Sequence, residues 1–123
     1  MTKQRLTLGA WGEDRATEFL CARGFKILER NYRCALGEVD IIACDCKSLI
    51  FVEVKTRRSA SFGLPQEAVG ARKQQQLIRV AQWYLKAPGT LRLNPRFDVV
   101  AILIRSGQTP EITHIANAFS LTG

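Results

Sequence analysis

Apolar and polar residues recur with two different periods along the chain, and the changes of period predict its elements. Apolar residues three or four positions apart predict helices over residues 8–23 and 66–86. Alternating or continuous apolar runs predict strands over residues 25–33, 37–44, 48–55, 96–105 and 111–115. We expect 96–105 to be buried on both faces, because it holds six consecutive apolar residues, and 111–115 to be an edge strand. The order α-β-β-β-α-β-β predicts a single α/β domain over residues 1–123, with a central mixed β-sheet flanked by helices.

Charged residues interrupt the two runs that are best suited to form a core, GEVDIIAC (37–44) and SLIFVEVK (48–55). If residues 45–48 form a four-residue turn, the register of the hairpin follows from the turn length. The expected opposed pairs are Cys44 with Leu49, Ile42 with Phe51, Asp40 with Glu53, and Glu38 with Lys55. Directly opposed side chains share a face of the sheet, with Cβ atoms about 4.5–5.5 Å apart. The pattern therefore predicts that Asp40, Glu53 and Lys55 form one cluster.

Two interpretations of this cluster are open on the residues alone. Neighbouring carboxylates repel each other unless a cation lies between them, and Lys55 offsets only one charge. A divalent cation such as Mg²⁺, which prefers oxygen ligands, would resolve the repulsion. The alternative is a cross-strand salt bridge from Glu53 or Glu38 to Lys55 on a solvated face, which would contribute little stability.

A further acid, Glu13, lies at the edge of the apolar stripe of the first predicted helix, within reach of the sheet. It could join the cluster, or it could be an acid near the helix N-terminus that interacts favourably with the helix dipole.

Positive charge dominates the composition and is least offset by acids over residues 72–105. There are 18 Lys and Arg against 11 Asp and Glu, a net charge of +7, which favours a polyanionic partner such as nucleic acid or an anionic membrane surface. Arg57 and Arg58 follow the charged hairpin directly, and the stretch 72–105 holds seven cations against one acid. Arg72 and Lys73 begin that stretch. Lys73 is on the inward stripe of its helix, where it needs an anion, either an acid of the cluster or a substrate phosphate.

Other features narrow the class of protein. No apolar run is long enough for a secretory signal or a membrane span, so we expect a cytoplasmic protein that does not bind a membrane. The four cysteines lack zinc-site spacing and are expected to be reduced thiols. Four aromatic residues are expected in the core, in preference to a role as base-stacking platforms: Trp11, Trp83, Tyr84 and Phe97.

The charged hairpin resembles a known nuclease motif. Asp40, twelve intervening residues and then Glu53-Val54-Lys55 look like the D…(D/E)xK motif of restriction-endonuclease-like nucleases, apart from Val39 where that superfamily has proline. Together with GxxGExxA (9–16), RNYR (30–33), FGLPQEAV (62–69) and RFDVV (96–100), the chain is similar to the YraN family of small bacterial proteins, which are related in fold to archaeal Holliday-junction resolvases.

The resemblance implies a restriction-endonuclease-like core and a metal-dependent phosphodiesterase site. Asp40, Glu53 and the backbone carbonyl of Val54 would bind Mg²⁺ or Mn²⁺, and Glu13 would complete the shell directly or through water. Lys55 would position and help to activate the attacking water.

The expected function is therefore that of a DNA endonuclease acting on double-stranded or branched DNA, with Arg57, Arg58, Arg72 and Lys73 contacting phosphates. A non-catalytic nucleic-acid-binding module of the same fold and an assembly or scaffold subunit are the alternatives. A homodimer is left open, because structure-selective resolvases usually act as two-fold dimers.

Overall fold

The computed structural model describes residues 7–58, 69–88 and 93–120. Two helices, α1 (Leu8–Ala22) and α2 (Ala71–Tyr84), accompany five strands. The strands are β1 (Lys26–Cys34), β2 (Gly37–Cys44), β3 (Ser48–Arg57), β4 (Asn94–Leu103) and β5 (Glu111–Phe119). The predicted order α-β-β-β-α-β-β is confirmed.

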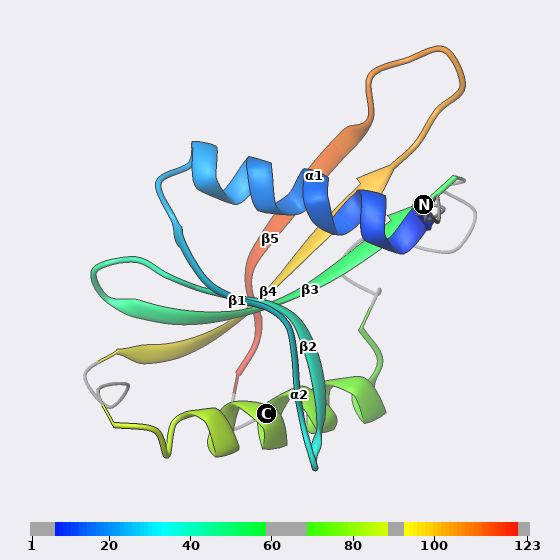
Figure 1. The fold of residues 1–123 in the computed structure, drawn as a ribbon. Coiled ribbons are helices and arrows are strands. Elements are labelled where there is room, and N and C mark those ends of the chain that lie inside the picture. Colours follow the sequence, from blue (N-terminus) through cyan, green and yellow to red (C-terminus); the bar gives the residue numbers. More distant parts are fainter. Residues whose placement is uncertain (1–6, 59–68, 89–92, 121–123) are drawn as a thin grey trace, which may run out of the picture.

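The five strands form one mixed sheet in the order β1-β2-β3-β4-β5. Neighbouring strands are antiparallel except β3 and β4, which are parallel because α2 lies in the connection between them. Figure 1 shows α1 and α2 on opposite sides of the twisted sheet. Among the described helices, none is long and apolar enough to cross a membrane.

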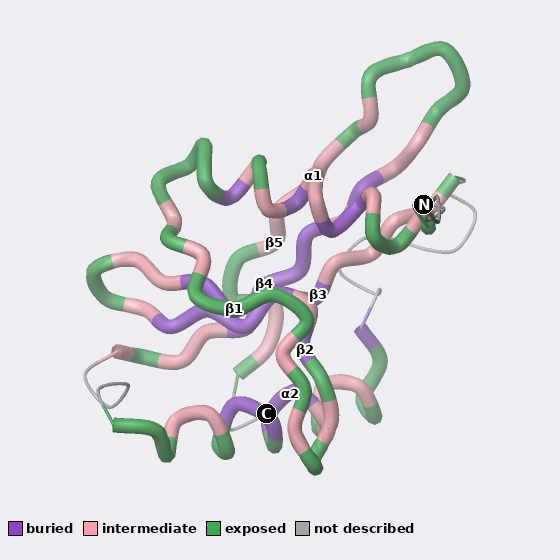
Figure 2. Tube along the Cα trace, in the orientation of Figure 1, coloured by how far each residue is buried: buried purple, intermediate pink, exposed green. Residues whose placement is uncertain are grey.

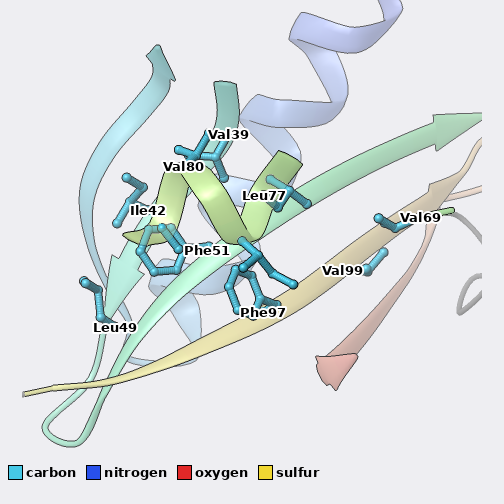
Figure 3. Close-up of a cluster of buried hydrophobic side chains, with 11 residues drawn as sticks. Val39, Ile42, Leu49, Phe51, Val69, Leu77, Val80, Phe97 and Val99 are labelled. Carbon is cyan, nitrogen blue, oxygen red and sulfur yellow. The ribbon is translucent and has the colours of Figure 1, made fainter. Parts of the chain in front are cut away.

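The sheet buries an apolar layer on each face. On the α2 side, Phe51 and Phe97 from the parallel pair of strands pack against Leu77 and Val80 of the helix (Figure 3). On the α1 side, a second cluster is formed by Ala16, Leu20, Ile41, Ala43, Ile50, Val52, Val100 and Ile102. Figure 2 shows that burial is concentrated in the central strands and on the sheet-facing sides of the helices. This two-sided burial explains the long apolar run of β4, and β5 lies at the sheet edge, as predicted.

Several predicted boundaries are wrong, each for a local reason. Helix α2 begins at Ala71 instead of residue 66, because Gly70 has an extended backbone and acts as the N-cap; residues 66–68 lie outside the described part of the chain. Strand β4 begins at Asn94, two residues before the predicted start at residue 96, and includes Pro95. The N–H of Asn94 donates to the carbonyl of Lys47, which starts the parallel ladder before the proline.

One aromatic residue expected in the core is exposed. Trp83 is 45% exposed, whereas Phe97 is buried and Tyr84 packs against the α2-side cluster. The stripe of α2 that faces the sheet is already occupied by Leu77, Val80 and Ala81, so the indole of Trp83 lies outside it.

A close approach between α1 and β3 sets the geometry of the region described next. A Cβ atom on Gly12 would overlap the side chain of Thr56, so only glycine lets the helix come this near to the strand. The neighbouring residue on α1 is Glu13. The contact therefore brings an acidic side chain toward the C-terminal half of β3.

Candidate functional site

The site lies where β2 and β3 separate, which we call the β2–β3 fork (residues 38–40 and 53–55). The paired residues of the hairpin are Cys44 with Leu49, Ala43 with Ile50, Ile42 with Phe51 and Ile41 with Val52. This is the register that the turn length predicts. Beyond the last pair, the carboxylate of Asp40 accepts a hydrogen bond from the backbone N–H of Val54 (Oδ2 to N, 2.8 Å). A side chain of one strand thus bonds to the backbone of the next in the place of a ladder bond.

Side-chain alternation in β2 is interrupted at Asp40. Val39 packs in the α2-side cluster and Ile41 in the α1-side cluster, although residues two apart on a regular strand share a face. On β1, Asn31 has a positive φ of 53° at the same level, between the pairs of Arg30 with Ile41 and of Tyr32 with Val39. The irregularity of both strands turns the Asp40 side chain into the space between β2 and β3.

This irregularity also corrects the prediction for Glu38. Glu38 is exposed and forms an ion pair with Arg33 across the β1–β2 ladder (Oε2 to Nε, 3.1 Å). The expected pairings of Asp40 with Glu53 and of Glu38 with Lys55 are wrong, because the β2–β3 ladder ends at Ile41 and Val52.

Glu53 is the buried acid of the fork. Its side chain is near two lysines, with Lys55 Nζ 3.4 Å from Oε2 and Lys73 Nζ 3.9 Å from Oε1. Although Oε1 is buried, it accepts no hydrogen bond, and Lys73 donates instead to Gln76 Oε1 at 2.9 Å. The inward-facing Lys73 of α2 therefore meets an acid of the predicted cluster.

The electrostatics of Glu53 indicate a deficit of positive charge. Burial is the main cause that raises the pKa of Glu53, and the charge of Asp40 adds to it; Lys73 and Lys55 oppose the rise, and the net result is a pKa of about 7. Two lysines are thus insufficient to keep the buried Glu53 fully ionised at neutral pH.

Glu13 reaches the same region from the other face of the sheet. Its Oε1 accepts hydrogen bonds from Arg30 Nε at 3.2 Å and from Asn31 Nδ2 at 3.0 Å. Burial raises the pKa of Glu13 most, the Arg30 cation lowers it, and the charge of Asp40 raises it further. Glu13, Arg30, Asp40 and Val54 line a common cavity of about 410 Å³.

The donor set fits a hard divalent cation in part. Asp40 and Glu53 supply two carboxylates, and Glu53 Oε1 is a buried acceptor without a hydrogen-bond donor. Within residues 7–58, 69–88 and 93–120, however, no three His, Cys, Asp or Glu side chains lie close enough together to hold a metal ion. Mg²⁺ typically takes one or two protein carboxylates and completes its shell with water and phosphate oxygens, which is compatible with this pair. Because Arg30 and Asn31 hold Glu13, its direct participation stays a prediction.

The basic residues predicted to bind phosphates have different positions. Arg58 is exposed directly after β3, whereas Arg57 is partly buried at the strand's last position. Arg72 is exposed in the first turn of α2, beside Lys73. Residues 59–65, which follow Arg58, lie outside the described residues.

A second buried charge, which the sequence analysis did not single out, is Asp98 in β4. Its carboxylate accepts two hydrogen bonds from the Arg96 guanidinium (2.9 and 2.8 Å) and one from the backbone N–H of Asn117 (2.9 Å). Nε2 of His114 lies 2.7 Å from Oδ2 of the same carboxylate. Burial raises the pKa of Asp98, but the hydrogen bonds from His114 and Arg96 outweigh it, so the pKa lies below the ordinary value. The only signal in the sequence was the RFDVV motif. With all its partners supplied from β4 and β5, Asp98 joins these two strands.

Comparison with known proteins identifies the family. The model of the uncharacterised protein family UPF0102 matches residues 12–102. A UPF0102 protein of Syntrophotalea carbinolica is 55% identical over 123 residues, covering 100% of this chain and 99% of that protein. UPF0102 proteins of Geobacter sulfurreducens and Caldanaerobacter subterraneus are 52% and 42% identical, covering 93% and 92% of this chain and 89% and 94% of their own lengths. The chain therefore belongs to the UPF0102 family, which is YraN-like, as its motifs indicate.

Proposed function

We propose that the protein is a metal-dependent DNA endonuclease whose active site is the β2–β3 fork. The observation that carries the proposal is Glu53, a buried carboxylate that lies beside a second carboxylate and keeps one oxygen without a hydrogen-bond donor. Such an arrangement costs stability in a protein that has no use for it. A divalent cation would relieve the repulsion and satisfy the free oxygen.

The residues of the fork have distinct roles in this proposal. Asp40, Glu53 and the carbonyl of Val54 would hold Mg²⁺ or Mn²⁺, which would supply charge neutralisation and lower the pKa of a bound water. Lys55, already 3.4 Å from Glu53, positions the attacking water and offsets the charge of the scissile phosphate. Glu13 contributes through water, because Arg30 and Asn31 hold its Oε1.

DNA is the substrate class that the charge distribution favours. The net charge is +7, and Lys73, Arg72 and Arg58 are distributed around the fork on α2 and at the end of β3. Phosphate contacts of this kind bind DNA independently of sequence. The resemblance to restriction-endonuclease-like resolvases supports branched DNA as the preferred substrate and a homodimer as the active form.

A non-catalytic nucleic-acid-binding module is the second candidate. It is favoured by the lack of a third suitably placed metal-ligating side chain among the described residues. In that case, Lys55 and Lys73 would neutralise a vestigial carboxylate pair.

The deciding experiment incubates end-labelled linear, flapped and four-way DNA with the pure protein in EDTA, Mg²⁺ or Mn²⁺. The endonuclease proposal expects metal-dependent cleavage of at least one substrate, and loss of that cleavage in Glu53→Gln prepared in parallel. Cleavage that is unchanged in Glu53→Gln would indicate a contaminating nuclease and count against the proposal. DNA binding without any cleavage would favour the second candidate.

A further inference from the structure

The side of α2 that faces away from the sheet is a continuous cationic and polar surface. Its members are exposed and recur at three- and four-residue steps, so they lie in one stripe; these residues, the α2 outer face, are Arg72, Gln75, Arg79, Gln82, Trp83 and Lys86. The sequence has no Asp or Glu between Glu67 and Asp98. The positive charge of this face is therefore not offset by acids of its own helix, which makes the face complementary to a polyanion.

An aromatic cavity adjoins the C-terminal end of this face. It has a volume of about 380 Å³ and is lined by Tyr32, Trp83, Tyr84, Lys86 and Ala87. The Lys86 ammonium lies 5.6 Å from the centroid of the Trp83 ring, so a cation accompanies the exposed indole.

The walls of the cavity are held in place by ring contacts. Tyr32 and Tyr84 meet edge to face, with centroids 5.1 Å apart, and Tyr84 packs in the same way on the buried Phe51. Burial raises the pKa of the Tyr32 hydroxyl, and a hydrogen bond from Trp83 opposes that rise. A large apolar ring held by such contacts, yet 45% exposed, offers a preformed surface for another flat ring.

The N-terminal end of α2, where the outer face begins at Arg72, lies beside the β2–β3 fork. Lys73, on the same helix, lies 3.9 Å from Glu53. Trp83 follows Lys73 by ten residues, about 15 Å along the helix axis at 1.5 Å per residue. That separation corresponds to about four base steps of B-DNA at 3.4 Å.

We propose that the α2 outer face binds the phosphates of a DNA strand and that the aromatic cavity takes an unpaired base from it by stacking on Trp83. The inference deepens the proposed function, on which it rests for the choice of DNA, by specifying a substrate with a single-stranded arm. An unpaired base has an accessible face for stacking, whereas a base within a duplex is already stacked on both sides. Stacking on an aromatic side chain accepts any base, which suits a protein that reads DNA structure instead of sequence.

The test measures binding in EDTA, so that it does not depend on cleavage. Fluorescence anisotropy compares a blunt duplex with the same duplex carrying a single-stranded arm, and with an arm whose nucleotides are abasic. We expect the parent to bind the armed duplex more tightly than the other two. Trp83→Ala should lose about tenfold in affinity for the armed duplex and change little for the blunt one, and Trp83→Phe should recover most of the loss.

Two matched charge variants separate the phosphate contacts from the stacking. Lys86→Gln should weaken binding to both duplexes, whereas Lys47→Gln, in the exposed turn before β3, should have a smaller effect on either. Circular dichroism and thermal melting of each variant check that the fold is retained.

The inference is overturned if the parent binds the abasic and the normal arm equally, a result that needs no variant. It is also overturned if Trp83→Ala weakens binding to the armed and the blunt duplex by the same factor. The same holds if this variant changes self-association in sedimentation but leaves DNA affinity unchanged. If the arm effect is present but no DNA is cleaved in any metal, the binding site stands and the endonuclease proposal fails. If DNA is cleaved but the armed duplex is not bound more tightly than the blunt one, the endonuclease proposal stands and the base-stacking inference fails.

Discussion

The carboxylate of Asp40 in β2 accepts a hydrogen bond from the backbone N–H of Val54 in β3, with 2.8 Å between Oδ2 and N. The acid is therefore fixed by the backbone of the strand that carries Glu53 and Lys55. An asparagine at this position could present its side-chain oxygen to the same N–H. The charge of the candidate site can thus be altered while its geometry is kept.

Removing one negative charge from the fork should separate catalysis from binding. We expect Asp40→Asn and Glu53→Gln to lower turnover of a cleavable DNA by several orders of magnitude, because bound metal stabilises much of the charge in the transition state. Both variants should bind DNA at least as tightly as the parent, since repulsion of the phosphate is reduced. Lys55→Ala should also lose turnover but bind slightly more weakly. Single-turnover cleavage and anisotropy measure the two properties, and retained turnover in both acid variants would exclude the fork as the active site.

The stability of the metal-free protein should fall as pH rises through the titration of Glu53. Its pKa is about 7 in the folded state against an ordinary value of 4.5, so the folded state binds more protons than the unfolded state between these values. The free energy of unfolding should therefore decrease from about pH 4.5 to 7, by roughly 3 kcal/mol at most. Glu53→Gln should remove this decrease and be more stable than the parent near pH 8.

Urea denaturation in EDTA at several pH values measures this effect. Comparison with Glu53→Gln isolates Glu53, because the two proteins differ at this residue alone. Parallel pH profiles of parent and variant would contradict the prediction.

Divalent metal should stabilise the parent through the same two carboxylates. A ligand at one hundred times its dissociation constant stabilises the folded state by about 2.7 kcal/mol. We expect Mn²⁺ or Mg²⁺ to raise the melting temperature of the parent by several degrees. The increase should be absent from Asp40→Asn and Glu53→Gln, and an equal increase in Glu53→Gln would place the metal elsewhere.

The Asp98 network that joins β4 and β5 should contribute strongly to stability. Asp98→Asn places an amide donor against the guanidinium of Arg96 and the ring of His114, and should cost about 3 kcal/mol at neutral pH. The folded pKa of Asp98 is below the ordinary 3.8, so its contribution is present above about pH 4 and is lost as the pH falls through the folded value. Glu111→Gln removes an exposed acid that lies 3.8 Å from Arg105, and should change stability by less than about 0.5 kcal/mol. Equal effects of the two variants in urea denaturation would refute this assignment.

The cations at the end of β3 should contribute to the salt dependence of DNA binding. Arg57→Ala and Arg58→Ala should each weaken binding to duplexes of different sequence by a similar factor, and should lower the slope of log affinity against log salt by about one. Lys47→Ala removes the same charge from the opposite end of the strand and serves as the control. A slope that falls equally in the control would mean that net charge alone governs binding.

The order of the elements and the register of the β2–β3 hairpin follow from the sequence alone. Alternation identified β2 and β3, and the four-residue turn set the pairs of Cys44 with Leu49 and of Ile42 with Phe51. Both are short-range properties, since the side-chain period and the turn length act within a few residues. The inward stripe of α2 likewise predicted that Lys73 would meet an anion.

The groups from distant elements that surround these residues depend on how the whole chain folds. Strict alternation predicted a regular strand through Asp40, but the positive φ of Asn31 in β1 and the end of the β2–β3 ladder redirected the side chain and left Glu38 to pair with Arg33. The ion pair between Arg30 and Glu13 and the exposure of Trp83 also depend on how separate elements pack. Such contacts are decided by the competition of many side chains for the same interior space, which no pattern within a single segment contains.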